Sequence, residues 1–217
     1  MLELWMVRHG QTEFSRENRF CGSIDPPLSE LGQRMADALG AGHGRDPWTA
    51  IYCSPSTRAR QTVAPLAKLA KLEPILDDGL REISYGDWEG MRHEDAKTKF
   101  PAEYAYWAQD TASRGTPGGE TAFMVAARAA PVVERIRREH EAKDGQRERV
   151  LVVSHKATLR ILVCALLGLD VRLFRERIAQ PVCALSCFRI KAGGSAMLER
   201  LGDVSHLPPE LREAEGT

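Results

Sequence analysis

The sequence has no excess of charge of either sign. Over 217 residues, 30 lysines and arginines balance 30 aspartates and glutamates. Without net charge, no overall field attracts nucleic acid or an anionic membrane surface, so we expect neither as a partner. No apolar run reaches the roughly 20 residues of a membrane span, and the first residues lack the basic leader and apolar length of a signal peptide. We therefore expect a cytoplasmic protein in which any anion site is local.

Cysteine pairs of the kind that bind metals or form disulfides are also missing. The five cysteines are an odd set without a Cys-x-x-Cys pair: Cys21, Cys53, Cys164, Cys183 and Cys187. This pattern argues against a disulfide framework and a zinc knuckle, and it fits a reducing compartment. The sequence has no Gly-x-x-x-x-Gly-Lys loop, and the glycines at 40, 42 and 44 miss the dinucleotide-binding spacing. The residues therefore give no sign of a metal or a nucleotide cofactor.

Short apolar runs alternate with helical patterns along the chain. The runs predict strands at residues 2–7, 51–53, 74–76, 150–153, 182–190 and 196–201, the last two forming a hairpin around Gly193-Gly194. Apolar spacing predicts helices at 29–39, 57–70, 121–136 and 159–167, with a kink or a broken turn at Pro65. The alternation predicts an α/β fold, a three-layer sandwich whose central sheet is mostly parallel and is flanked by helices.

Two histidines stand directly after apolar strands. His9 follows the run at residues 2–7, and His155 follows the run at 150–153 by one residue. In open α/β sheets, ligands bind beyond the carboxyl ends of the strands, so both imidazoles are expected in that crevice. Arg8 precedes the first histidine, and Arg58 begins the helix that follows the strand at 51–53. The other four histidines, at 43, 93, 140 and 206, lack such placement and are expected at the surface.

These residue types have a common explanation in phosphoryl transfer. A neutral imidazole attacks phosphorus in line when its other ring nitrogen is fixed as a donor. Arginines hold the phosphate oxygens with paired N–H groups, and a second histidine, preferably protonated, adds a donor to the transition-state charge. A leaving alcohol needs a proton. Glu82, just after the third strand, is the best candidate donor, with Asp77, Asp78 and Asp87 as rivals by position.

The chain length fits one domain that carries an insertion. We expect residues 1–209 to form this domain and residues 210–217 to form a flexible C-terminal tail. Residues 79–119 are rich in Gly, Trp, Tyr and charge, and we expect a lid-like insertion over the active site. The apolar stretch 182–188 is either a buried strand or part of a dimer edge, so a homodimer remains open.

Several motifs occur along the chain in the same order as in a known family. The string Val7-Arg-His-Gly-Gln-Thr-Glu closely resembles the signature of the histidine phosphatase superfamily, which contains cofactor-dependent phosphoglycerate mutases and many small-molecule phosphatases. Further matches are Asp25-Pro-Pro-Leu-Ser-Glu-Leu-Gly, Ser54-Pro-Ser-Thr-Arg-Ala-Arg-Gln-Thr, Leu80-Arg-Glu, Tyr85-Gly-Asp-Trp-Glu-Gly, Pro117-Gly-Gly-Glu and Val153-Ser-His. The resemblance, over residues 2–170, implies that His9 is phosphorylated, that Glu82 donates the proton, and that Arg8, Arg58 and His155 form the phosphate pocket. It implies no metal and no nucleotide.

Some positions depart from the pattern of this family. Ser15 stands where many relatives have an asparagine that touches the phosphate, and Cys21 replaces a frequent glutamine. Lys156 follows His155 where small glycines are common, and it either favours an acidic substrate or faces solvent. The predicted substrate-binding residues are Ser15, Cys21, Gly22, Arg81 and Lys156, and further lining candidates are Arg19, Tyr85, Trp107 and Arg114.

The segment after the proton donor bears on the reaction. Residues 86–119 are shorter than the corresponding segment of the mutases, contain no adjacent arginine pair, and include Gly-Asp-Trp-Glu-Gly as in the phosphatase branch. We therefore predict hydrolysis of small-molecule phosphomonoesters such as sugar phosphates or phosphoglycerate derivatives. The alternatives are a phosphoglycerate mutase-type phosphotransferase and a non-catalytic phosphate-binding regulatory module.

Overall fold

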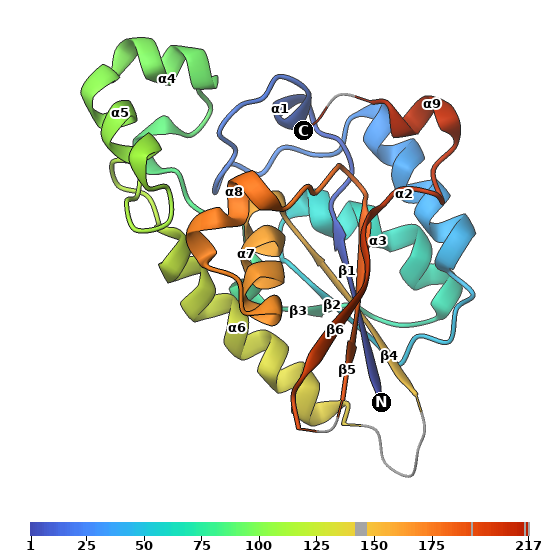
Figure 1. Cartoon of the computed structure of the whole chain (residues 1–217). Helices are drawn as coiled ribbons and strands as arrows, with labels where there is room; N and C mark the ends of the chain where they lie inside the picture. The colour runs from blue at the N-terminus through green and yellow to red at the C-terminus, as the bar shows by residue number, and fades with distance from the viewer. Residues whose placement is uncertain (142–146, 192, 215, 217) are drawn as a thin grey trace.

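A six-stranded sheet runs through the middle of the molecule (Figure 1). The computed structural model describes residues 1–141, 147–191, 193–214 and 216. The strand order is β3-β2-β4-β1-β5-β6. The strands are β1 (Leu2–Arg8), β2 (Ala50–Cys53), β3 (Ile75–Leu76), β4 (Glu148–Ser154), β5 (Leu185–Ile190) and β6 (Ala196–Asp203). The first four strands are mutually parallel, whereas β5 and β6 pair antiparallel as a hairpin. The predicted mostly parallel sheet is confirmed.

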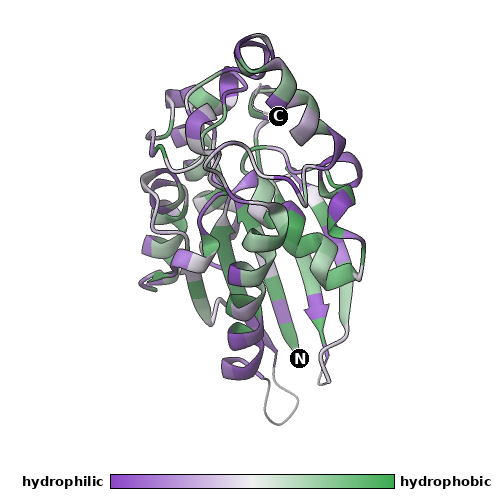
Figure 2. Cartoon of the chain, turned by 90° about the vertical axis from the view of Figure 1, so that its left-hand side faces the viewer, coloured by the Kyte–Doolittle hydropathy of each residue, from purple (hydrophilic) through white to green (hydrophobic). Residues whose placement is uncertain are grey.

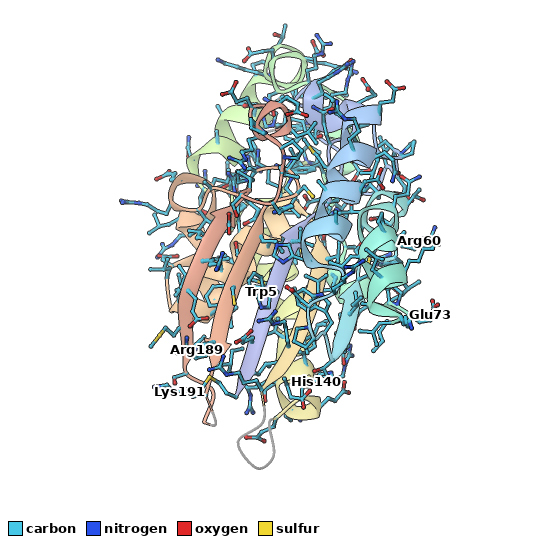
Figure 3. The ribbon with its side chains drawn as sticks, turned by 90° about the vertical axis from the view of Figure 1, so that its right-hand side faces the viewer. Trp5, Arg60, Glu73, His140, Arg189 and Lys191 are labelled. Carbon is cyan, nitrogen blue, oxygen red and sulfur yellow. The ribbon has the colours of Figure 1, made fainter. Side chains whose placement is uncertain are left out.

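Helices cover both faces of this sheet. Figure 1 shows α6 (Ala122–Glu139) and α7 (Lys156–Leu167) on one side, and α2 (Glu30–His43) and α3 (Thr57–Ala70) on the other. Neighbouring side chains of a strand point to opposite faces, so Met6 packs with the first pair of helices and Trp5 with the second. Trp5 is labelled in Figure 3. In Figure 2 the strands are mostly green, and purple residues gather on the surrounding helices and loops. These layers confirm the predicted three-layer α/β sandwich.

Shorter elements connect these layers. They are the α-helices α1 (Glu13–Arg16), α4 (His93–Lys99), α5 (Pro101–Gln109), α8 (Phe174–Arg177) and α9 (Pro209–Arg212), and the 3-10 helices η1 (Asp78–Leu80), η2 (Gly86–Trp88) and η3 (Val171–Leu173). Among the described residues, no helix is long and apolar enough to cross a membrane.

The predicted insertion, residues 79–119, packs around its own aromatic cluster. Trp88 is fully buried there, and Trp107 meets it edge to face with the ring centroids 5.5 Å apart. Phe20, from the loop after α1, completes the cluster, so the insertion is held against the N-terminal part of the chain. Its helices α4 and α5 lie beyond the ends of the strands, at the upper left of Figure 1. A lid role for this segment remains a prediction.

Three local expectations gain detail from the structure. A broken turn at Pro65 is wrong, because α3 continues through it and packs closely on Gly40 of α2. Within the stretch 182–188, residues 185–188 belong to a buried strand, β5, which lies between β1 and β6, whereas residues 182–184 form a turn before it. A homodimer would therefore need a surface other than this strand. In the predicted C-terminal tail, α9 packs Leu211 into the core, where it is 2 % exposed, whereas residues 215 and 217 lie outside the described residues.

Candidate active site

Two adjacent strands bring the two histidines together. β1 and β4 are parallel neighbours whose register pairs Arg8 with Ser154, so the next residues, His9 and His155, leave the sheet side by side. The backbone N–H of His9 donates to the carbonyl oxygen of Ser154 at 3.0 Å. The imidazole centroids are 5.2 Å apart, and the residues are 5 % and 0 % exposed. The expected meeting of these residues at the strand ends is thus observed.

The surroundings of His9 fix its tautomer. Nδ1 lies 2.7 Å from the carbonyl oxygen of Gly10, which only accepts hydrogen bonds, so Nδ1 carries the proton. Nε2 therefore keeps its lone pair. Burial, together with the charges of Arg58 and Arg8, holds the pKa of His9 well below its ordinary value. The ring is neutral at physiological pH, which is the state a nucleophile needs.

His155 is also neutral in this site. Its Nε2 lies 2.8 Å from the hydroxyl of Ser54, and its Nδ1 is buried without a hydrogen-bond partner in the described residues. Burial, then the charges of Arg58 and the neighbouring cations, lower the pKa of His155 well below its ordinary value. The expectation of a protonated second histidine is therefore wrong for this site, because burial and the nearby arginines favour the neutral ring.

Arg8 and Arg58 place buried positive charge beside these rings. They are 3 % and 2 % exposed. Arg8 donates from Nη1 to the carbonyl oxygen of Gln180 at 2.8 Å, and Arg58 donates from Nη1 to that of Ile24 at 2.9 Å. In both guanidinium groups Nε is buried without a partner in the described chain. Burial lowers the pKa of Arg8 to about 10, so it stays charged at neutral pH. Guanidinium N–H groups without an acceptor, on side chains fixed by other hydrogen bonds, can donate hydrogen bonds to a bound anion.

Glu82 lies at the start of α7. Its carboxylate oxygens accept hydrogen bonds from the backbone N–H groups of Ala157 and Thr158, both at 3.3 Å. These contacts hold the carboxyl group of Glu82 in one orientation at the edge of the site. Its rival Asp77 instead accepts from the N–H of Gly79 at 2.8 Å and pairs with Arg135. Among the acidic candidates, Glu82 has the position that a proton donor needs.

Two cavities meet at these residues. The first, hereafter the His9 cleft, is lined by Arg8, His9, Thr12, Ser15, Asn18, Arg19, Phe20, Cys21, Glu82, Tyr85, His93, Lys156, Ala157, Arg160, Phe174 and Arg175. The second includes Arg58 and His155 in its lining, and Glu82 borders both. All five residues predicted for catalysis therefore border one of two adjoining cavities. The arrangement offers a neutral nucleophile, a carboxyl group and fixed anion donors.

Comparison with known proteins identifies the family. Residues 4–203 match the histidine phosphatase superfamily (branch 1). The chain belongs to this superfamily. It is 34% identical over 174 residues to phosphoserine phosphatase 1 of Hydrogenobacter thermophilus, covering 80% of each chain. It is also 34% identical over 205 residues to the 2,3-bisphosphoglycerate-dependent phosphoglycerate mutase of Azorhizobium caulinodans, covering 92% of each.

Structural similarity agrees with this histidine phosphatase assignment. The solved structure of a mycobacterial glucosyl-3-phosphoglycerate phosphatase superposes with a TM-score of 0.84 at 28% identity. The match covers 92% of this chain and 98% of that one. The common fold therefore includes nearly the whole chain.

The predicted substrate-binding residues of this histidine phosphatase divide between the cavities. Ser15, Cys21 and Lys156 line the His9 cleft, while Gly22 and Arg81 line the second cavity. The Ser15 hydroxyl donates to the carbonyl oxygen of Thr12 at 2.9 Å within the cap of α1. Burial raises the pKa of Cys21 to about 11, so its thiol stays neutral. The Arg81 side chain is 62% exposed and pairs with Asp78.

Of the four further lining candidates, two line the His9 cleft and two do not. Arg19 and Tyr85 line the His9 cleft, and Trp107 lies in the adjoining aromatic cluster. Arg114 instead lies over the ring of Tyr106, with the guanidinium carbon 4.1 Å from the centroid. The sequence analysis missed several cleft residues, and the titratable ones among them are His93, Arg160 and Arg175. His93, expected at the surface, packs on Phe20 with centroids 3.9 Å apart.

The described residues contain no group of three or more His, Cys, Asp and Glu side chains arranged to hold a metal ion.

Proposed function

We propose that this protein is a phosphomonoesterase that hydrolyses small phosphorylated metabolites through a phosphohistidine intermediate on His9. The observation that carries the proposal is the neutral His9 ring, whose Nε2 keeps its lone pair beside the buried cations Arg8 and Arg58. Membership of the histidine phosphatase superfamily supports the reaction class. The names of the relatives, which refer to phosphoserine and glucosyl-3-phosphoglycerate, support small sugar phosphate or phosphoglycerate-type substrates.

In the first step, Nε2 of His9 attacks phosphorus and the bond from phosphorus to the alcohol oxygen breaks. Glu82 gives its proton to that oxygen, so a neutral alcohol leaves. Arg8 and Arg58 hold the non-bridging oxygens through their Nε–H groups, which have no partner among the described residues. Nδ1–H of His9 keeps its bond to the Gly10 carbonyl and stabilises the positive imidazole formed by attack.

In the second step, water attacks phosphorus and the bond to Nε2 of His9 breaks. The Glu82 carboxylate takes the proton of the attacking water, and inorganic phosphate leaves. The enzyme returns to its starting state, with His9 neutral and Glu82 protonated for the next leaving group. Each proton given in the first step is thus regained in the second.

The setting of this activity is part of the proposal. A cytoplasmic location is supported by the five free thiols, which a reducing compartment preserves. The partner is the small-molecule phosphomonoester itself, with neither nucleic acid nor a membrane involved.

A phosphoglycerate mutase-type transferase is the second candidate. It is supported by the 34% identity to a mutase over 92% of the chain. The two activities share the phosphohistidine and differ in the acceptor, which is water in one case and a second substrate hydroxyl in the other.

The test uses p-nitrophenyl phosphate in excess chelator. We expect turnover by the wild type, and a loss of several orders of magnitude for His9→Ala, because no covalent route remains. Acid quenching during turnover with a labelled substrate should trap an acid-labile phosphoryl adduct that His9→Ala lacks. Near-native turnover by a folded His9→Ala variant would reject the mechanism. Exchange of label between phosphoglycerates without phosphate release would favour the mutase.

A further inference from the structure

The His9 cleft contains three cations that the proposed phosphoryl transfer does not use. Lys156 and Arg160 are four residues apart on α7 and therefore project from the same helix face. Arg175 comes from α8, which packs against α7. All three line the cleft together with Arg8 and His9. The cluster, hereafter the α7/α8 basic cluster, thus adjoins the nucleophile without being part of its phosphate pocket.

Among the described residues, no carboxylate forms an ion pair with this cluster. In the part of the chain that the structure describes, none of the three cations has an acidic group within ion-pair distance, whereas Arg128 pairs with Glu120 at 2.9 Å. Nε of Arg160 and Nε of Arg175 are buried without a hydrogen-bond partner among the described residues. Burying a cation whose N–H groups have no acceptor costs free energy. A bound anion that accepts those hydrogen bonds removes this cost.

Aromatic rings hold one cation of this cluster in place. The Arg175 guanidinium carbon lies 4.5 Å from the Trp107 ring centroid and 5.5 Å from that of Phe174. Nη2 of Arg175 donates to the Tyr85 hydroxyl at 3.2 Å. Stacking fixes a guanidinium without consuming a negative partner, which leaves other N–H groups for a ligand.

The charges of the cluster also act on one another. Burial, followed by the charges of Arg8, Arg160 and Arg175, lowers the pKa of Lys156 to about 7. Glu82 acts in the opposite direction and raises the pKa of Lys156, but its effect is smaller than those of the three arginines. The Glu82 carboxyl group is hydrogen-bonded to the N-terminus of α7. An acidic ligand group would relieve the repulsion and favour the charged ammonium group.

We propose that Lys156, Arg160 and Arg175 form a second anion subsite, which binds an acidic group on the leaving-group side of the substrate. The preferred substrates are then small phosphomonoesters that carry a carboxylate or a second phosphate. The inference rests on the proposed function, because the subsite shares the cleft of His9. It deepens that function by assigning substrate choice to α7 and α8.

The kinetic test compares two substrates that differ in the second charge. Phosphoserine carries a carboxylate, and phenyl phosphate has a neutral leaving group. For Arg160→Gln, we expect kcat/KM for phosphoserine to fall about 10- to 100-fold, the range for losing one charge-assisted hydrogen bond, and kcat/KM for phenyl phosphate to change less than about threefold. Lys156→Gln provides a second variant. Arg172→Gln is the matched control, because Arg172 is 61% exposed and already pairs with Asp170.

A binding test separates failure of the subsite from failure of the proposed function. Calorimetry compares methylphosphonate with phosphonoacetate and methylenediphosphonate, which are not hydrolysed. The wild type should bind the two doubly acidic ligands at least tenfold more tightly, and Arg160→Gln should lose that preference. The stronger of the two ligands distinguishes a carboxylate from a second phosphate. The subsite would be overturned if the wild type bound all three phosphonates with equal affinity. It would also be overturned if Arg160→Gln lowered kcat/KM for phosphoserine and for phenyl phosphate by the same factor. Preferential binding without any turnover would reject only the proposed reaction.

Discussion

The Ser54 hydroxyl oxygen lies 2.8 Å from Nε2 of His155, and both residues follow the ends of neighbouring strands. The backbone N–H of Ser54 donates to the carbonyl oxygen of Val153 at 2.9 Å, so the hydroxyl is held on a rigid part of the sheet. This contact fixes the orientation of the His155 ring. Its buried Nδ1 remains without a partner in the described residues and can meet a ligand.

Ser54→Ala should therefore lower kcat. Losing one buried hydrogen bond corresponds to about 1 kcal/mol, or about fivefold in rate, because the ring is no longer held in one orientation. Ser56→Ala is the control, since its hydroxyl is 3.4 Å from the same nitrogen. Steady-state kinetics should give a change below about twofold for the control. A larger loss for Ser56→Ala than for Ser54→Ala would contradict this reading of the contact.

Removing Arg58 should weaken catalysis much more. Arg58→Ala deletes a buried donor beside both histidines, and we expect a loss on the order of 10²–10³ in kcat/KM for p-nitrophenyl phosphate. Arg60→Ala is the matched control on the same helix, because Arg60 is exposed on the surface of α3 (Figure 3). Comparable losses in the two variants would mean that general positive charge, not a fixed donor, supports the reaction.

Stability should fall as the pH is lowered from 7 to 5. Burial, with the charge of His43 next, lowers the pKa of His206 to about 4, against about 6.5 in the unfolded chain. The unfolded state therefore binds more protons between these values, and stability present above pH 6.5 is lost as the pH falls through this window. His206→Asn should reduce the slope of unfolding free energy against pH by at most about 1.4 kcal/mol per pH unit.

Urea denaturation at several pH values measures this slope. His9 and His155 also have lowered pKa values, so the variant should keep part of the pH dependence. Equal slopes for the wild type and His206→Asn would show that His206 titrates normally in the folded protein.

Gly86→Ala should destabilise the insertion next to the cleft. Gly86 has φ 52°, and a Cβ there would lie 2.1 Å from the carbonyl oxygen of Pro117, a backbone atom that cannot easily move. Gly168→Ala is the control, because its φ is 65° but nothing lies within 4 Å of the added carbon. We expect a loss of about 1–2 kcal/mol for the control and about 3 kcal/mol or more for Gly86→Ala.

Chemical denaturation of both variants separates two contributions to the loss of unfolding free energy, the backbone strain of a positive φ and the steric clash with the Pro117 carbonyl oxygen. Equal losses would mean that the loop at Pro117 moves away without cost.

The sequence was most informative where buried strands end in polar residues. The run at residues 2–7 had to be a central strand because nearly every side chain in it is apolar, and that placed Arg8 and His9 at its carboxyl end. Ser29, a good capping residue, begins the helix predicted at 29–39, and its hydroxyl accepts from the N–H of Gly32 at 3.1 Å. Such features depend on residues close in sequence, so a linear pattern suffices to predict them.

Contacts between distant segments could not be predicted in this way. Arg175 reaches the cleft only because α8 packs on α7, and its cation–π partner Trp107 belongs to the insertion. Arg160 had a detectable signal, its four-residue spacing from Lys156, but that spacing alone does not show which side of a helix faces a cavity. The neutral state of His155 depends on burial beside cations from several elements, which the sequence does not show.

The pairing of Arg8 with Ser154 also makes enzymatic turnover a sensitive reporter of refolding. If the two strands re-formed one position out of alignment, one histidine would move by about 3.3 Å and its side chain would point to the opposite face of the sheet. Recovery of circular dichroism after denaturation would then not be matched by recovery of activity. The ratio of the two signals therefore measures the fraction of molecules in which these strands have found their native alignment.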